Sequence, residues 1–201
     1  MKIILTSTGT KDPAVGQYIL DSLGEPTKTK LLLIQTATNV IEDVAFAIKE
    51  KKRLYELGFD ITEFDLAEKT PKETGKALDE ADTIFVTGGQ PYYLLKEMRN
   101  SGFADLAKEK LTNKVYIGAS AGSYVVCPNI EMGSWKREKR KFDLTDLTAL
   151  GLVDFMVFAH YEEKYETLLE EKKKTAEYEV FGISDTQAIS VVGGKREFIN
   201  F

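Results

Sequence analysis

Ser120 is placed as a serine nucleophile commonly is. It stands at the centre of residues 118–122, Gly-Ala-Ser-Ala-Gly, between the apolar residues 115–117 and a helix-like segment that ends at Pro128. A tight turn from a strand into a helix crowds its central residue, and glycines two positions away on each side permit it. A glycine-rich turn with a surface serine would show the same pattern. The setting between strand and helix favours a nucleophile for acyl transfer.

His160 is the candidate base for this serine. A serine hydroxyl is a poor nucleophile until a base takes its proton, and histidine is the side chain whose ordinary pKa lies near neutrality. His160 is the only histidine of the chain, and it follows an apolar stretch, residues 153–159, that predicts a strand. In open α/β sheets, sites form at the carboxyl ends of strands. We therefore expect His160 to meet Ser120 at one edge of the sheet.

A carboxylate is needed to hold the ring of such a base in the correct tautomer. Four carboxylates lie within reach along the chain, at Glu131, Asp143, Asp146 and Glu162. We favour Glu131, on a strand-like piece shortly after Pro128, and Asp143 is the next choice. Glu162 is too close in sequence to His160 to orient its ring easily.

Gly88 and Gly89 follow an apolar stretch, residues 83–87, and precede a helix-like segment. They can be a simple turn between strand and helix. A glycine there also lets a backbone N–H approach a reacting carbonyl, which would add an oxyanion donor beside the amide of Ala121 at the start of a helix. Phosphate binding is a poor alternative, because no phosphate-binding glycine loop follows the first strand.

Strand-like and helix-like segments alternate through the first two thirds of the chain. Strands are predicted at residues 2–7, 31–36, 61–64, 83–87 and 115–117, with helices at 13–23, 41–57, 91–101 and 104–111. This order predicts a mostly parallel sheet with helices on both faces in a single domain, residues 1–201. Towards the C-terminus, a charged helix at 161–174 and a hairpin of 187–192 with 196–201 predict an antiparallel edge.

Composition excludes several classes of function. The chain has 201 residues, 43% apolar and 29% charged, and a net charge of −5, which argues against general nucleic-acid binding. No apolar stretch approaches the ~20 residues of a membrane span or has the form of a signal peptide, so we expect a cytoplasmic protein without membrane contact. Cys127 is the only cysteine and is expected to be a small buried residue. No metal site is expected, because ligand spacings are missing around His160.

Two segments together resemble the peptidase E family, the S51 serine peptidases that include aspartyl dipeptidase and, more distantly, cyanophycinase. Residues 86–90, Val-Thr-Gly-Gly-Gln, followed by Leu94-Leu95, are similar to the family's V-x-G-G-N segment. Residues 117–123, Ile-Gly-Ala-Ser-Ala-Gly-Ser, with Cys-Pro-Asn-Ile at 127–130, are similar to its nucleophile segment. The second segment is the more specific one, and the similarity covers most of the chain.

The resemblance implies a three-layer, flavodoxin-like sheet similar to class I glutamine amidotransferase domains, with serine in place of their cysteine. Ser120 would attack, His160 would act as base, and the amides of Gly88 and Ala121 would hold the oxyanion. The third catalytic residue is aspartate or glutamate in the family, which admits Glu131. Hydrolysis of dipeptides or short peptides without metal or cofactor would follow, by a monomer or weak homodimer.

Two departures from the family pattern limit what carries over. Members specific for an N-terminal aspartate use an arginine shortly after the histidine, whereas no arginine occurs here between Arg140 and Arg196, so aspartate specificity is not expected. The basic residues 136–141 are a solvated loop or a substitute cation, and Gln90 replaces the usual asparagine. Two alternatives remain: a catalytically idle amidotransferase-like binding module and a cyanophycinase-like isopeptide hydrolase.

Overall fold

The computed structural model describes residues 1–201 and contains a seven-stranded sheet in the order β3-β2-β4-β5-β1-β8-β9. The strands are β1 (Lys2–Thr6), β2 (Lys30–Ile34), β3 (Asp60–Glu63), β4 (Thr83–Val86), β5 (Val115–Ala119), β8 (Gln187–Val192) and β9 (Lys195–Asn200). The first five strands are parallel, whereas β8 pairs antiparallel with both β1 and β9. The mostly parallel sheet with an antiparallel C-terminal edge is therefore confirmed.

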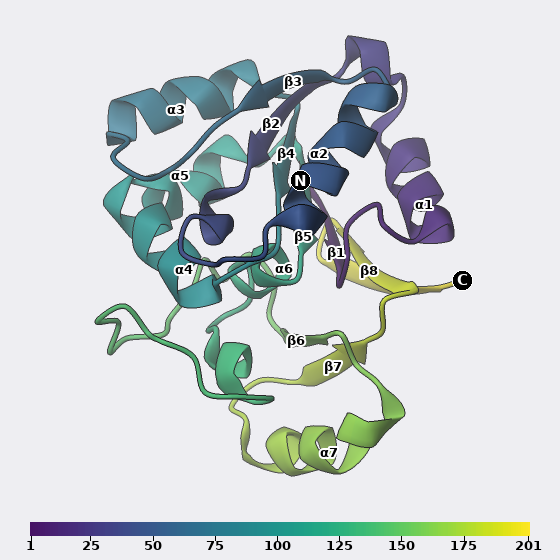
Figure 1. The fold of residues 1–201 in the computed structure, drawn as a ribbon, viewed down its shortest axis with the longest axis vertical. Coiled ribbons are helices and arrows are strands. Elements are labelled where there is room, and N and C mark those ends of the chain that lie inside the picture. The colour runs from purple at the N-terminus through teal and green to yellow at the C-terminus, as the bar shows by residue number, and fades with distance from the viewer.

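Helices cover both faces of this sheet and make three layers (Figure 1). One face carries α1 (Pro13–Leu23) and α2 (Ala45–Glu56), and the other carries α3 (Pro71–Glu80), α4 (Pro91–Asn100) and α5 (Phe103–Lys110). Successive residues of a strand point to opposite faces. Accordingly, Ile4 of β1 belongs to the core under α1 and α2, while Ile3 and Leu5 belong to the larger core on the other side. This two-sided burial explains why the central strands β1, β2, β4 and β5 are mostly apolar, whereas the edge strands β3 and β9 are polar and exposed.

Three helices begin with a proline in the first turn, preceded by a capping side chain. Asp12 caps α1 by accepting from two backbone N–H groups, and Thr70 forms a capping box with Glu73 at α3. Gln90 caps α4, since its side-chain oxygen accepts from Tyr92 N at 2.7 Å. The glutamine that replaces the family's asparagine thus has a structural task at the start of α4.

A second, two-stranded parallel sheet lies beyond the carboxyl ends of the central strands (Figure 1). It consists of β6 (Met156–Ala159) and β7 (Val180–Ile183), joined by the 3-10 turn η4 (Glu163–Tyr165) and α7 (Glu166–Thr175). The strand predicted at 153–159 is present in its second half, and the helix predicted at 161–174 corresponds to η4 and α7. The sequence pattern predicted neither β7 nor the separation of this sheet from the main one.

The segment after Ser120 differs most from expectation. The helix α6 (Ala121–Tyr124) is a single turn, and it ends well before Pro128. Residues 129–142 were expected to contain a short strand, but they form the 3-10 turn η3 (Glu131–Ser134) and a loop, with an isolated bridge from Asn129 to Thr148. Two more 3-10 turns, η1 (Pro26–Lys28) and η2 (Thr36–Thr38), flank β2.

None of the helices has the length and apolar character needed to cross a membrane.

Candidate active site

The tight turn predicted at Ser120 is present at the carboxyl end of β5. Ser120 has φ 49° and ψ −106°, a backbone conformation that L-residues rarely adopt. A Cβ on Gly118 would lie 2.6 Å from the backbone of Gly122, and one on Gly122 would lie 2.1 Å from the carbonyl oxygen of Val86. Both glycines are therefore required by close backbone approach, as the spacing indicated.

Buried hydrogen bonds hold this turn rigid. The hydroxyl of Tyr116 donates to the carbonyl of Gly122 at 2.8 Å. The hydroxyl of Ser123 lies 2.8 Å from the carbonyl oxygens of Thr6 and Gly118, and it accepts from Thr6 N at 3.1 Å. These bonds link the turn to the end of β1, so the strained conformation of Ser120 is imposed by the strands on either side.

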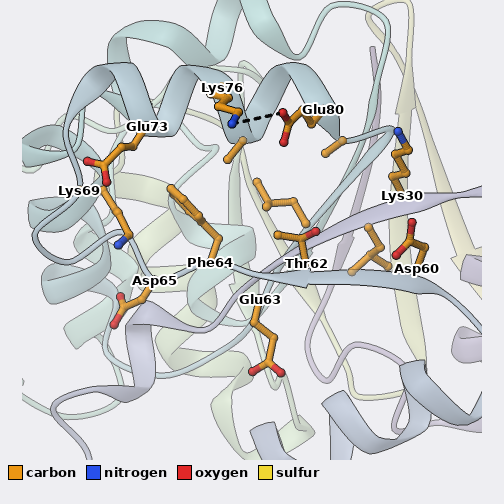
Figure 2. Close-up of a pocket in the computed structure, with 14 residues that line it drawn as sticks. Lys30, Asp60, Thr62, Glu63, Phe64, Asp65, Lys69, Glu73, Lys76 and Glu80 are labelled. Carbon is orange, nitrogen blue, oxygen red and sulfur yellow. Dashed lines mark ion pairs between the residues drawn. The ribbon is translucent and has the colours of Figure 1, made fainter.

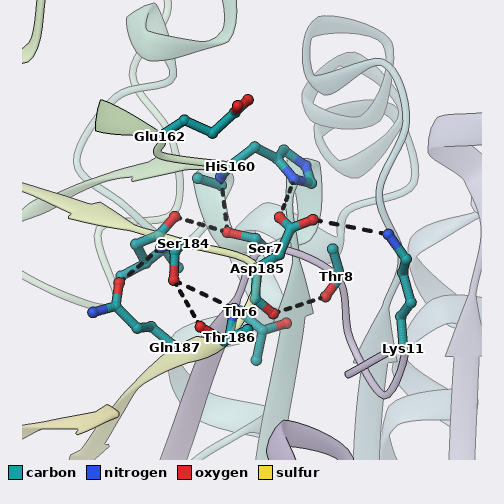
Figure 3. A network of polar contacts seen from close by, with 12 residues as sticks. Thr6, Ser7, Thr8, Lys11, His160, Glu162, Ser184, Asp185, Thr186 and Gln187 are labelled. Atoms are coloured by element: carbon teal, nitrogen blue, oxygen red, sulfur yellow. Dashed lines mark hydrogen bonds and ion pairs between the residues drawn. The ribbon is translucent and has the colours of Figure 1, made fainter. Parts of the chain in front are cut away.

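Ser120 and His160 are both anchored to the end of β1. The backbone N–H of Ser120 donates to Thr6 O at 3.0 Å. The backbone N–H of His160 donates to the hydroxyl of Ser7, the residue that follows Thr6, at 2.8 Å. The Ser7 hydroxyl in turn donates to Ile183 O at 3.0 Å, which joins the end of β7 to the same point (Figure 3). The two residues therefore lie at one edge of the molecule. No hydrogen bond joins the hydroxyl of Ser120 to the imidazole.

The ring of His160 is paired with Asp185. Its Nδ1 lies 2.8 Å from Oδ1 of Asp185, and Figure 3 shows the two side chains facing each other. The side chains are 44% and 46% exposed, and Lys11 lies 3.8 Å from the other carboxylate oxygen. A carboxylate on Nδ1 fixes the proton there and leaves Nε2 as the basic nitrogen.

Asp185, and not Glu131, is the carboxylate at the histidine ring. Glu131 opens η3, where its backbone N–H donates to the side chain of Asn129 at 3.1 Å, and its carboxylate forms no ion pair with His160. The reason is the pairing of β7 with β6, which sets Ile183 opposite Ala159, so the residues that follow the two strands meet. The choice of Glu131 is corrected accordingly.

The other three candidate carboxylates do not pair with His160 either: two form ion pairs with other residues, and one lies in the loop after η3. Asp146 pairs with Arg99 at 3.0 Å and Glu162 with Lys164, while Asp143 lies in the loop with φ 65°. The signal that could have pointed to Asp185 was the short apolar stretch 180–183, Val-Phe-Gly-Ile, followed directly by polar residues. It reads as a buried strand whose carboxyl end bears an aspartate.

Gly88 lies against the serine, and Gly89 lies against the backbone of Ala37. A Cβ on Gly88 would be 3.2 Å from the Cβ of Ser120, and one on Gly89 (φ 140°) would be 2.3 Å from the carbonyl oxygen of Ala37. Neither glycine amide donates to an acceptor within the protein. Ala121 is the first residue of α6, and the N–H groups of a first helical turn lack partners in the helix. Backbone amides without acceptors therefore occur both in the glycine turn next to Ser120 and in the residue after it.

Cys127 is fully buried, and burial raises the pKa of its thiol to about 12. Its S–H donates to Ser123 O at 3.4 Å, so the residue packs beneath the turn at Ser120. A thiol held neutral at physiological pH does not act as a nucleophile. The only cysteine of the chain therefore belongs to the core that supports the turn.

The basic segment 136–141 is attached to the site at both ends. The Lys136 ammonium donates to the backbone carbonyls of Ala159, at 2.9 Å, and His160. The side-chain amide of Gln90 donates to the carbonyl of Arg140. The segment thus runs between the histidine and the glycine turn after β4, with Arg137 and Lys141 exposed.

A large cavity lies away from Ser120. It has a volume of about 710 Å³ and lies between α3 and the β3 edge of the sheet, where Figure 2 shows lysine and carboxylate side chains of mixed charge. A smaller cavity of about 340 Å³ lies at the ends of β2 and β3. Neither is lined by the glycine turn, the serine or the histidine.

The fold and this edge of the sheet together define a class of protein. A serine on a strained strand-to-helix turn, a histidine paired with aspartate and backbone amides without acceptors are groups that an α/β serine hydrolase would require. A model of Peptidase family S51 matches residues 3–199. The chain belongs to this peptidase family.

Known relatives agree with this membership. The chain is 35% identical over 167 residues to an uncharacterized peptidase of Listeria monocytogenes serovar 1/2a, with 80% of each chain covered. It is 38% identical over 130 residues to an uncharacterized peptidase of Listeria innocua, which spans 64% of this chain and 62% of that protein. The crystal structure of a proposed peptidase E protein from Listeria monocytogenes EGD-e superposes with a TM-score of 0.86 at 29% identity, covering 100% of this chain and 98% of the other.

Proposed function

We propose that the chain is a cytoplasmic serine peptidase that hydrolyses dipeptides or short peptides through an acyl-enzyme on Ser120. His160 is the general base, Asp185 orients its ring, and the amides of Gly88 or Gly89 and of Ala121 bind the oxyanion. The observation that supports this most directly is that the backbones of Ser120 and His160 are hydrogen-bonded to consecutive residues, Thr6 at the end of β1 and Ser7 directly after it. The carboxylate on Nδ1 supports the same assignment.

The proposed reaction has two halves. The Ser120 oxygen attacks the scissile carbonyl carbon while His160 Nε2 takes the hydroxyl proton, and the resulting oxyanion accepts hydrogen bonds from the free amides. Collapse breaks the C–N bond, and the imidazolium returns its proton to the leaving amine. Water then attacks the ester by the same route, which releases the acid and restores the serine.

Short peptides are the proposed substrates because the chain belongs to a peptidase family and an aromatic side chain lies near the glycine turn beside Ser120. A Cβ on Gly88 would lie 3.7 Å from the ring of Phe46, a residue that is 42% exposed, so an exposed aromatic ring lies beside the glycine turn. The described relatives are called peptidases, which favours a peptide bond over another amide. An isopeptide substrate and an idle binding module are the alternatives.

Covalent labelling tests the proposal. A fluorophosphonate probe forms a stable bond only with a serine that an adjacent base activates. We expect stoichiometric labelling of the folded protein, found at Ser120 by peptide mass spectrometry, and none after denaturation. Turnover of a dipeptide panel that includes Asp-X, Glu-X and β-linked members then separates a peptidase from an isopeptide hydrolase. A folded protein that stays unlabelled would support the idle module.

Replacement of Asp185 distinguishes the two carboxylates that have been considered. We expect Asp185→Asn to lower kcat by roughly 10²- to 10³-fold, because an amide cannot hold the Nδ1–H tautomer. Glu131→Gln, the matched control, should leave kcat within about twofold, since its carboxylate does not contact the ring. Steady-state kinetics on one dipeptide measures both. Equal losses in the two variants would contradict the role given to Asp185.

A further inference from the structure

The ammonium of Lys136 is surrounded by aromatic rings and backbone carbonyl groups, unlike that of an ordinary surface lysine. Its ammonium lies 4.7 Å from the ring centre of Phe158 and 4.4 Å from that of Tyr165, and it forms no ion pair. Both of its hydrogen-bond acceptors are backbone carbonyls, those of Ala159 and His160. Partial burial of a cation without a carboxylate partner costs free energy, which is offset here by aromatic faces and two carbonyl groups.

The backbone at His160 is the part of the site that requires such support. His160 has φ 54°, in the left-handed region that non-glycine residues seldom occupy. Its N–H is fixed by Ser7 on one side, and its C=O is fixed by Lys136 on the other. The loop that carries Lys136 is itself packed on β6, since the rings of Trp135 and Phe158 lie 5.7 Å apart.

We propose that Lys136 is a positioning residue, which holds the backbone of His160 in its left-handed conformation and thereby aims the imidazole at Ser120. The proposal rests on the function proposed above and adds a residue to it. Lys136 touches neither substrate nor the reacting atoms in this arrangement. It acts through the two carbonyl groups at the end of β6.

The hydrogen bonds from Lys136 to the two backbone carbonyls should weaken when the lysine loses its proton. Burial lowers the pKa of Lys136 to about 8. The negative charges of Glu162 and Asp185 raise this pKa, and the positive charges of Lys164 and Lys139 lower it further. Below this pH the ammonium donates charge-assisted hydrogen bonds and attracts the aromatic rings. Above it, the neutral amine donates more weakly, so kcat should fall to a lower plateau and not to zero.

The first measurement is independent of activity. The chain has one histidine, so histidine labelled with ¹³C at its carbonyl gives one signal, from the carbonyl group that Lys136 contacts. We expect this signal to shift with a midpoint near pH 8 in the wild type, and no such step in Lys136→Met or Lys136→Arg. Any step that belongs to the ring of His160 should remain in all three proteins. An unchanged step near pH 8 in Lys136→Met would overturn the contact.

The second measurement is the pH profile of hydrolysis, with a dipeptide and with p-nitrophenyl acetate, an ester without a titratable group. Lys136→Met should lower kcat roughly tenfold to hundredfold with KM within about twofold, and its profile should lack the alkaline fall. Lys136→Arg keeps its charge at all these pH values, so it should restore most of kcat and also lack the fall.

Three outcomes decide the matter. A folded Lys136→Met protein with wild-type kcat overturns the proposal. A fall of kcat at alkaline pH that persists in Lys136→Arg also overturns it. If Lys136→Met does not fold, the result for Lys136→Arg decides. Wild-type hydrolysis by Ser120→Ala would instead overturn the proposed function, while the carbonyl titration would still report on Lys136 and His160. Circular dichroism at each pH verifies that the fold is intact.

Discussion

Ser120→Ala is expected to lower kcat by about 10⁵- to 10⁶-fold, the loss that follows when the nucleophile of a serine hydrolase is removed. The hydroxyl of Ser120 has no hydrogen-bond partner within the protein, so its removal should change the free energy of unfolding by less than about 0.5 kcal/mol. Dipeptide turnover and urea denaturation of the same preparation measure the two effects. Loss of activity with retained stability is the signature of a chemical role.

Ser22→Ala is the matched control, because Ser22 lies on α1 and makes no hydrogen bond through its side chain. It should retain wild-type turnover and should still be labelled at Ser120 by the fluorophosphonate. If Ser120→Ala kept more than about a tenth of wild-type kcat, the nucleophile would have to be sought elsewhere.

Gly122→Ala should be the most damaging change to stability at this site. The new Cβ would lie 2.1 Å from the carbonyl oxygen of Val86, and that atom belongs to the backbone of a central strand. Such an overlap cannot be relieved by a change of rotamer, so β4 and α6 must move apart. We expect a loss of at least about 3 kcal/mol in the free energy of unfolding, together with loss of activity, because Ser120 is displaced.

Gly75→Ala supplies the matched comparison. Gly75 lies inside α3, where the nearest atom to a new Cβ is Leu106 Cδ1 at 3.6 Å, an ordinary contact. Removing a glycine from a helix interior should stabilise the protein by about 0.5 to 1 kcal/mol. Urea midpoints for the two variants should therefore move in opposite directions. A Gly122→Ala protein as stable as the wild type would refute the close packing of α6 on β4.

The paired strands β6 and β7 explain what sequence reasoning missed at the histidine. An apolar stretch can be recognised as a strand, but its partner and its register depend on contacts between residues far apart in the chain. Pairing of Ala159 with Ile183 brings Asp185 to His160 although the two are separated by the whole of α7. Glu131 lies near Ser120 in sequence, but nearness along the chain does not decide position across a sheet.

Lys136 illustrates the same limit for a charged loop. A cluster of basic residues is ordinarily solvated, and nothing in residues 136–141 distinguishes one lysine from the next. In the structure, the contact of Trp135 with Phe158 draws the start of this loop onto β6, and only then does the next residue face two carbonyl groups. The sequence shows that Lys136 is present, but the groups around its ammonium belong to β6 and the residues after it.

The sequence alone determined the features whose causes are local. The alternation of apolar strands and amphipathic helices predicted the parallel sheet, Gly193 and Gly194 between two strand-like segments predicted the C-terminal hairpin, and the small residues around Ser120 predicted a turn too tight for larger ones. The tertiary structure decided which carboxylate meets His160, which lysine supports it and that its strand belongs to a separate sheet. These depend on pairing between distant segments, where the free energy comes from the complete packed arrangement and not from any one stretch of residues.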